Sequence, residues 1–381
     1  MPQLDVAMPL ALLTVVIVAL FLNKRVEGKL MRTVEKKQFK TRDVVLLVVF
    51  IAVMISVIAY TTLVSPGAVL QNILIVVFLS SYTMLLFTFS YIFSNLSSRK
   101  AMINSVAFGV ASSVAAAACT FWPLVDSYTP LRVAAFAGLA FFCFGAAVYE
   151  HFKGAVKPRW YIAAQPPAIF ILLFVFFNYL HNIGTQYVWT PYLMDVFGFT
   201  FAILIIVYLS SLFSWKTVGI FAVLLTILDI ILVIGTGTMV AAAKQFTGLG
   251  LPVLVFLPNV PLLVSSTGEL QFRGLGLGDF FFAGVLAVQT YKKFGKKTAF
   301  ASIVAMSVAF GIWEAFLHDI LALLNPLLGR EIGGFPGTLM IISGWAPIVA
   351  IALISRRGKK QGVALTENAP LAPEAHNPQT N

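Results

Sequence analysis

Long apolar segments alternate with short polar ones along most of the chain. Apolar runs of about 17–25 residues are long enough to cross the hydrocarbon core of a bilayer as helices. Eleven runs fit this description, the ninth of them short: 6–23, 44–64, 68–93, 102–124, 131–150, 161–180, 194–213, 217–240, 277–291, 299–324 and 336–355. The pattern predicts an all-α polytopic membrane protein with about eleven transmembrane helices.

Basic residues occupy every second connection between these runs. Of the 26 lysines and arginines, those that fall elsewhere are Arg132, Lys244, Arg273 and Arg330. Short loops rich in Lys and Arg stay in the cytoplasm. The asymmetry therefore predicts an N-terminus outside and a C-terminus in the cytoplasm.

The composition agrees with a protein embedded in a lipid bilayer. The chain is 59% hydrophobic and 11% charged, and its mean hydropathy is +0.92. A water-facing globular protein would be less apolar. The net charge of +11 gathers at the ends of the predicted helices instead of forming one basic face, so we expect no binding to nucleic acid.

Two carboxylates interrupt the apolar pattern in the C-terminal half. Asp229 lies within the run 217–240, and Asp279 follows Gly276-Leu277-Gly278 at the head of the run 277–291. An ionisable group at the centre of a membrane helix costs about 2.5–3.5 kcal/mol on insertion scales, so by default it marks a functional site.

The two carboxylates are expected at the same depth. Asp229 comes thirteen residues after Lys216 and Asp279 thirteen residues before Lys292, and both lysines mark the predicted cytoplasmic edge. At a rise of 1.5 Å per residue, each Asp lies about 20 Å from this edge. Two adjacent carboxylates share a proton, so one can take a proton from water while the other polarises a peptide carbonyl.

The sequence around both residues resembles that of one protease family. Leu228–Val240 is similar to the Tyr-Asp helix of signal peptide peptidases and presenilins, with Leu228 where Tyr is usual, and Gly276–Asp279 matches their Gly-x-Gly-Asp motif. The resemblance implies an intramembrane aspartyl protease with Asp229 and Asp279 as catalytic residues. Gly276, Leu277 and Gly278 would then shape the turn at the pair.

The same resemblance suggests a substrate-binding segment and a division of the chain. The family's Pro-Ala-Leu element has its nearest match in Pro336-Gly337-Thr338-Leu339, which would contact the substrate. The likeness covers about residues 194–355, the expected catalytic region. Residues 1–193 would be a scaffold with extra N-terminal helices, since the family usually has nine, and 356–381 a disordered cytoplasmic tail.

A β-prone run lies between the two Asp helices. Leu251–Leu257 is bounded by Gly250 and Pro258, and Pro252 would confine a strand to a sheet edge. Such an edge could hold an unwound substrate by strand addition, with contacts at Leu251, Val253 and Val255. A surface-lying linker is the alternative, but the family has a short strand here.

Other polar residues offer weaker candidates. Glu314 and His318 are spaced i, i+4 within the run 299–324, which allows a hydrogen bond or ion pair between them. Glu314 could instead bond to a neighbouring helix, tune the carboxylate pair or line a water path. No Gly-x-Ser-x-Gly, HExxH or P-loop motif occurs in the sequence, and we expect no metal and no cofactor.

Two other functions compete with proteolysis of transmembrane substrates. A transporter or channel could use buried carboxylates to pass protons or cations. A prepilin-type peptidase also uses a membrane Gly-x-Gly-Asp, but its partner Asp comes early in the chain, where Asp5 and Asp43 are terminal or juxtamembrane. The predicted orientation favours substrates with a cytoplasmic N-terminus, such as remnant signal peptides.

Overall fold

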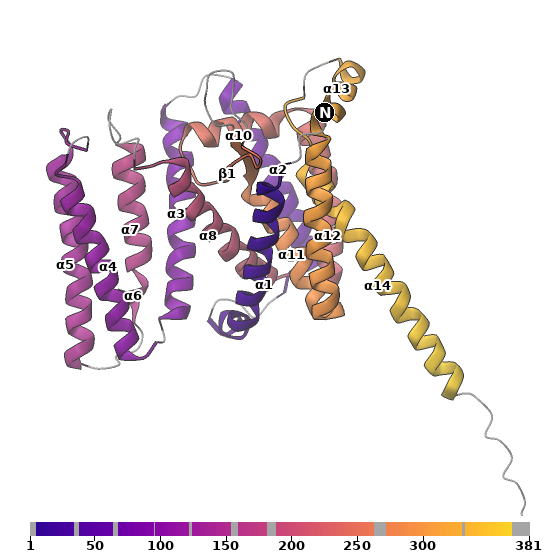
Figure 1. The fold of residues 1–381 in the computed structure, drawn as a ribbon, viewed down its shortest axis with the longest axis horizontal. Helices are drawn as coiled ribbons and strands as arrows, with labels where there is room; N and C mark the ends of the chain where they lie inside the picture. The colour runs from indigo at the N-terminus through magenta and orange to yellow at the C-terminus, as the bar shows by residue number, and fades with distance from the viewer. Residues whose placement is uncertain are drawn as a thin grey trace, which may run out of the picture.

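The computed structural model shows a helical bundle with a small β-sheet at one end (Figure 1). It describes residues 5–33, 38–63, 68–94, 96–121, 124–153, 159–180, 188–262, 272–329 and 332–367. The elements, in order, are α1 (Ala7–Thr33), α2 (Thr41–Leu63), α3 (Ala68–Phe93), α4 (Ser98–Ala118), α5 (Thr129–Lys153), α6 (Trp160–Ala163), α7 (Gln165–Phe174), the π-helix η1 (Val175–Tyr179), α8 (Pro191–Ser210), α9 (Trp215–Ile230), the π-helix η3 (Ile231–Gly235), α10 (Thr238–Gly248), β1 (Leu254–Pro258), β2 (Phe272–Gly276), α11 (Leu277–Phe294), α12 (Lys296–Ala315), α13 (Leu317–Leu328) and α14 (Gly337–Glu367).

Within the described chain, ten helical segments are long and apolar enough to cross a membrane. They correspond to ten of the eleven predicted runs, which confirms an all-α polytopic membrane protein. The remaining run, 277–291, forms α11, which has 18 residues and includes Asp279, Lys292 and Lys293. The count of eleven spans stays a prediction.

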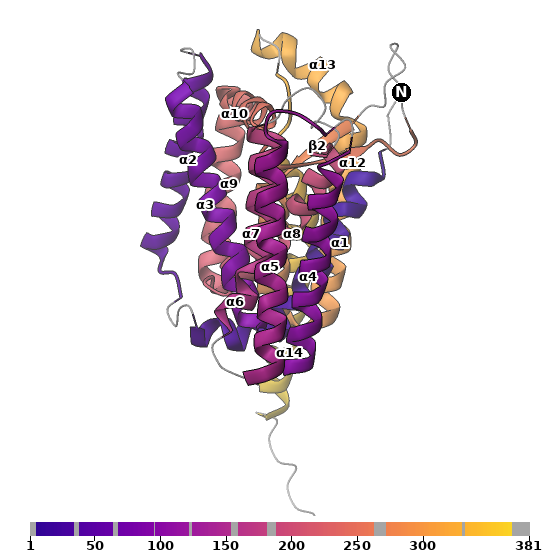
Figure 2. The same ribbon diagram turned by 90° about the vertical axis from the view of Figure 1, so that its left-hand side faces the viewer.

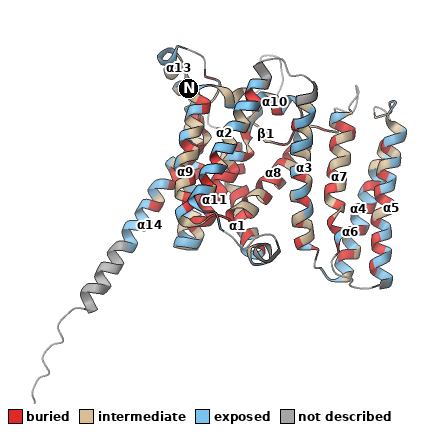
Figure 3. Cartoon of the chain, turned by 180° about the vertical axis from the view of Figure 1, so that it is seen from behind, coloured by how far each residue is buried: buried red, intermediate tan, exposed pale blue. Residues whose placement is uncertain are grey.

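The helix α11 lies in the middle of the bundle. Every residue from Phe280 to Thr290 is buried, and α8, α1, α12, α14 and α9 all pack against it. Gly284 allows the close approach of α8, since a Cβ there would lie 2.5 Å from the side chain of Ile206. Figure 3 shows the contrast between this buried centre and the exposed outer faces of α2, α4 and α5.

Two of the predicted runs break where they were expected to continue. The run 217–240 changes direction at Gly237, whose left-handed φ of 71° suits glycine and begins α10. The run 299–324 breaks at Phe316, between α12 and α13. Both α10 and α13 lie across the end of the bundle that holds the sheet (Figure 2).

The two ends of the bundle differ in character. The described N-terminus, the sheet, α10 and α13 gather at one end, and α14 ends at the other (Figure 1). At that second end Lys292 pairs with Glu27, and the backbone amide of Phe39 donates to Leu212 at 2.8 Å. Connections predicted to be cytoplasmic therefore meet there.

The C-terminal tail is partly helical. The sequence predicts disorder over 356–381, whereas α14 continues without a break to Glu367. Residues 368–381 lie outside the described part of the chain. The last membrane helix therefore extends past the basic residues that mark its predicted cytoplasmic edge.

Candidate active site

Asp229 lies near the end of α9 and faces the start of α14. Its Oδ2 accepts two hydrogen bonds from Thr338, one from the backbone amide at 3.1 Å and one from the hydroxyl at 2.7 Å. Thr338 is in the first turn of α14, where free amides and the helix dipole favour a carboxylate. The two residues are 109 positions apart in sequence, and their contact joins α9 to α14.

Asp279 lies in the first turn of α11, directly after β2. Its carboxylate accepts a hydrogen bond from the backbone amide of Gly276, the last residue of β2 and the one directly before the helix. On its other side it meets Gly337: a Cβ placed there would lie 2.4 Å from Oδ1 of Asp279. Only glycine leaves room for this approach.

The start of α14 thus brings the two carboxylates together. Asp279 contacts Gly337, Asp229 contacts the next residue, Thr338, and the two carboxylates interact electrostatically. Both side chains are half-buried, and Gly278 beside them is exposed. The pair therefore lies inside the bundle without being sealed from water.

The other motif residues have different surroundings. Pro336 is buried and Leu339 half-buried on either side of Gly337 and Thr338. The amide of Leu277 donates to the carbonyl of Val253 at 2.9 Å, which ties α11 to the segment before β1. Gly278 faces open space, so no close contact accounts for a glycine there.

The β-prone run forms β1, but its outer edge is occupied. Leu251 and Val255 are buried, and the carbonyl of Val253 is bonded to Leu277. The amide of Phe256, which points away from β2, donates to Oδ1 of Asp195 at 2.6 Å. The edge that was expected to receive a substrate is therefore covered by α8.

The other edge of the sheet belongs to β2, and no described strand pairs with it. β2 pairs antiparallel with β1, with Val255 opposite Leu275 and Leu257 opposite Arg273. Because backbone groups alternate in direction along a strand, those of Phe272, Gly274 and Gly276 point away from β1. Phe272 and Gly274 are exposed. This edge ends three residues before Asp279.

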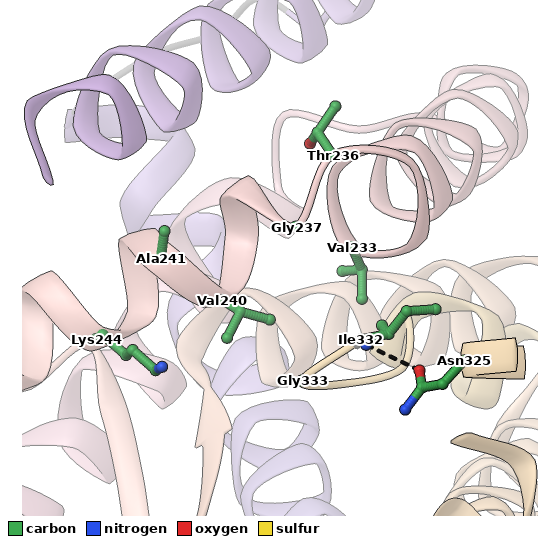
Figure 4. A pocket seen from close by; sticks show the side chains of 9 residues that line it. All are labelled: Val233, Thr236, Gly237, Val240, Ala241, Lys244, Asn325, Ile332 and Gly333. Atoms are coloured by element: carbon green, nitrogen blue, oxygen red, sulfur yellow. Dashed lines mark hydrogen bonds between the residues drawn. The ribbon is translucent and has the colours of Figure 1, made fainter. Parts of the chain in front are cut away.

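A cavity of about 500 Å³ opens at η3 and α10, the segments that follow Asp229 in the chain, and neither aspartate lines it. It is lined by Val233, Thr236, Gly237, Val240, Ala241, Lys244, Asn325, Ile332 and Gly333, from η3, α10, α13 and the segment before α14 (Figure 4). Asn325 accepts a hydrogen bond from the amide of Ile332 at 2.8 Å. This bond holds the segment that leads to Gly337.

Sequence reasoning missed two features near the site. Glu314 pairs with Arg273 of β2 at 3.0 Å instead of bonding to His318, because α12 ends before His318, which is exposed in α13. Asp195 is buried in α8. The sequence could have indicated Asp195 as a candidate, since it is an ionisable residue inside the apolar run 194–213.

Fold and site together define a polytopic membrane protein with a carboxylate pair between packed helices. The family model for signal peptide peptidase matches residues 31–312, and the chain belongs to this family. The family is one of intramembrane aspartic peptidases, which makes the chain a membrane protease. Comparison with curated proteins and with solved structures found no match.

The matched range corrects the extent of the resemblance at both ends. It begins in the first predicted cytoplasmic connection and includes most of 1–193, where the motifs gave no likeness. It ends at 312, before Pro336–Leu339. The role of that segment therefore depends on the contacts of Gly337 and Thr338 described above.

Proposed function

We propose that the chain is an endopeptidase that hydrolyses peptide bonds within transmembrane segments, with Asp229 and Asp279 activating the water. The supporting observation is that two carboxylates from different helices face consecutive residues of a third helix, Gly337 and Thr338. Like charges this close favour a shared proton. The ionised carboxylate takes a proton from water while the protonated one polarises the scissile carbonyl.

Thr338 prepares the pair for this reaction. Its amide and hydroxyl both occupy Oδ2 of Asp229, which leaves Oδ1 for water or for the shared proton. Gly337 lets Asp279 approach the same helix turn. Orientation of both groups before the substrate arrives lowers the cost of reaching the transition state.

The substrate must unwind, because a helix keeps its peptide bonds hydrogen-bonded and covered. An extended segment can pair with the outward backbone groups of Phe272 and Gly274 and with the carbonyl of Gly276, whose amide is bonded to Asp279. Antiparallel pairing is the more stable arrangement, and a partner antiparallel to β2 runs away from Asp279 toward the end of the bundle that holds the sheet. With that end outside, the substrate has a cytoplasmic N-terminus, as a remnant signal peptide has.

The structure offers no support for a prepilin-type pair. Asp5 accepts hydrogen bonds from the amides of Val260 and Ala7, and Asp43 accepts one from the amide of Lys40. Neither contact involves Asp279. Asp229 is the carboxylate that faces the same helix start as Asp279.

A reconstituted assay tests the proposal. The purified chain in lipid vesicles should cleave a reporter with one membrane helix and a cytoplasmic-type N-terminus, and Asp279→Asn should not. Glu27→Gln is a matched control, since it alters a half-exposed ion pair with Lys292 far from Asp279. If the unaltered chain passes protons or cations and cleaves no reporter, the transporter function replaces this one.

A further inference from the structure

An ion pair ties the second strand of the sheet to the interior of the bundle. Nη1 of Arg273 in β2 lies 3.0 Å from Oε1 of Glu314 in the last turn of α12. Their side chains are 24% and 9% exposed. Charges so far from water are costly unless they are paired, so each residue restrains the position of the other.

The side chain of Arg273 restrains β2 without using its open edge. Arg273 and Leu275 alternate with Phe272, Gly274 and Gly276, so they share one face of the strand. Leu275 is buried on that face, and Arg273 reaches Glu314 from it. Within the part of the chain that the structure describes, the outward backbone groups of Phe272 and Gly274 therefore remain available to an incoming segment.

The first strand has its own attachments. Asp195 accepts a hydrogen bond from the amide of Phe256 in β1. Asp5 accepts one at 2.8 Å from the amide of Val260, which lies two residues after the end of β1. The amide of Val6 also donates to the carbonyl of Val260 at 3.0 Å. Asp5 in turn lies within electrostatic range of Glu314. One anchor of β1, Asp5, therefore lies near the anchor of β2.

We infer that Arg273 and Glu314 are positioning residues that fix the edge of β2 in the geometry and register that a substrate strand needs. The inference rests on the proposed function, since it concerns how the substrate reaches Asp229 and Asp279. The pair acts through β2, which ends at Gly276, and has no contact with either aspartate among the described interactions. If β2 adopted its pairing geometry only part of the time, the apparent affinity for substrate would fall by that fraction. A β2 edge that is already fixed avoids this loss.

The pair should therefore affect substrate binding more than turnover. In Glu314→Gln and Arg273→Gln, we expect KM for the membrane-helix reporter to rise by about fivefold, with kcat within about twofold of the unaltered chain. The affinity of a short transition-state-mimicking inhibitor that contacts only the aspartates should not change. The exchange variant Arg273→Glu with Glu314→Arg should restore KM to within about twofold.

Glu150→Gln is the matched control for a general loss of stability. Glu150 forms a buried ion pair with Nε of Arg159 at 2.7 Å, at the far end of α5. This variant should lower the melting temperature without raising KM. An unchanged KM in both single variants, an equal rise in Glu150→Gln, or no recovery in the exchange variant would overturn the inference. Absence of cleavage by the unaltered chain would instead refute the proposed function.

Discussion

Thr338 donates both its backbone amide and its hydroxyl to a single oxygen of Asp229. The residue before it, Gly337, lies against the carboxylate of Asp279. One helix turn therefore fixes the position of both acidic groups.

The first prediction concerns the carboxylates themselves. Asp229→Ala and Asp279→Ala should each reduce reporter cleavage to background, and the double variant should be no worse than either single one. Residues that act as one unit give such non-additive effects. The measurement is reporter cleavage in vesicles, with membrane insertion checked by carbonate extraction. Clear activity in either single variant would exclude that residue from the reaction.

The second prediction separates the two hydrogen bonds of Thr338. Thr338→Val removes the hydroxyl but keeps the amide and the shape, so kcat should fall. A hydrogen bond to a charged group contributes about 1.5–3 kcal/mol, which corresponds to a fall of roughly 10- to 100-fold. Thr338→Ser retains the hydroxyl and should stay near the original rate. Equal kcat values for the Val and Ser variants would contradict the role of the hydroxyl.

The third prediction concerns the space at Gly337. Gly337→Ala places a Cβ where Oδ1 of Asp279 lies 2.4 Å away, so the carboxylate must move and cleavage should fall by at least an order of magnitude. Gly219→Ala in α9 is the matched control, because a Cβ there meets no atom within 4 Å. The two variants should differ in activity at equal expression. Comparable activity would mean that the carboxylate can shift without consequence.

The fourth prediction concerns the covered edge of β1. Asp195→Ala leaves the amide of Phe256 without its acceptor in a buried position, which should lower stability by about 1–3 kcal/mol. Asp195→Asn keeps an acceptor oxygen and should lose less. Thermal unfolding in detergent, followed by tryptophan fluorescence, measures both. An Ala variant as stable as the unaltered chain would show that α8 does not hold this edge.

The fifth prediction concerns orientation in the membrane. A cysteine at Gly248, at the end of α10, should react with a membrane-impermeant reagent on intact cells, and one at Lys297, at the start of α12, should not. Both positions are exposed, and the native Cys119 and Cys143 are buried. Labelling of Lys297→Cys alone would reverse the topology. The preferred substrates would then be helices with an outer N-terminus.

Sequence patterns located the parts of the fold that depend on local length and hydropathy. Ten membrane-length helices follow from apolar runs, and Asp229, Asp279, Gly337 and Thr338 follow from motifs. The break at Phe316 could not be predicted from the sequence pattern, because the run 299–324 is apolar on both sides of this residue. The Arg273–Glu314 pair depends on how distant segments meet, which hydropathy does not specify. That pairing takes Glu314 to β2 instead of to His318, the partner that the i, i+4 spacing allowed.

The burial of α11 has a consequence for how the protein is made. This helix has 18 residues, three of them charged, and starts directly from a β-strand, so its own partition into lipid is weak. Its buried residues lie against α8, α1 and α12 instead of acyl chains. Residues Ala7–Ser210 emerge from the ribosome before it and α12 after it. Stable insertion of α11 during synthesis therefore requires that α1 and α8 are already in the membrane, and its burial is completed when α12 packs against it.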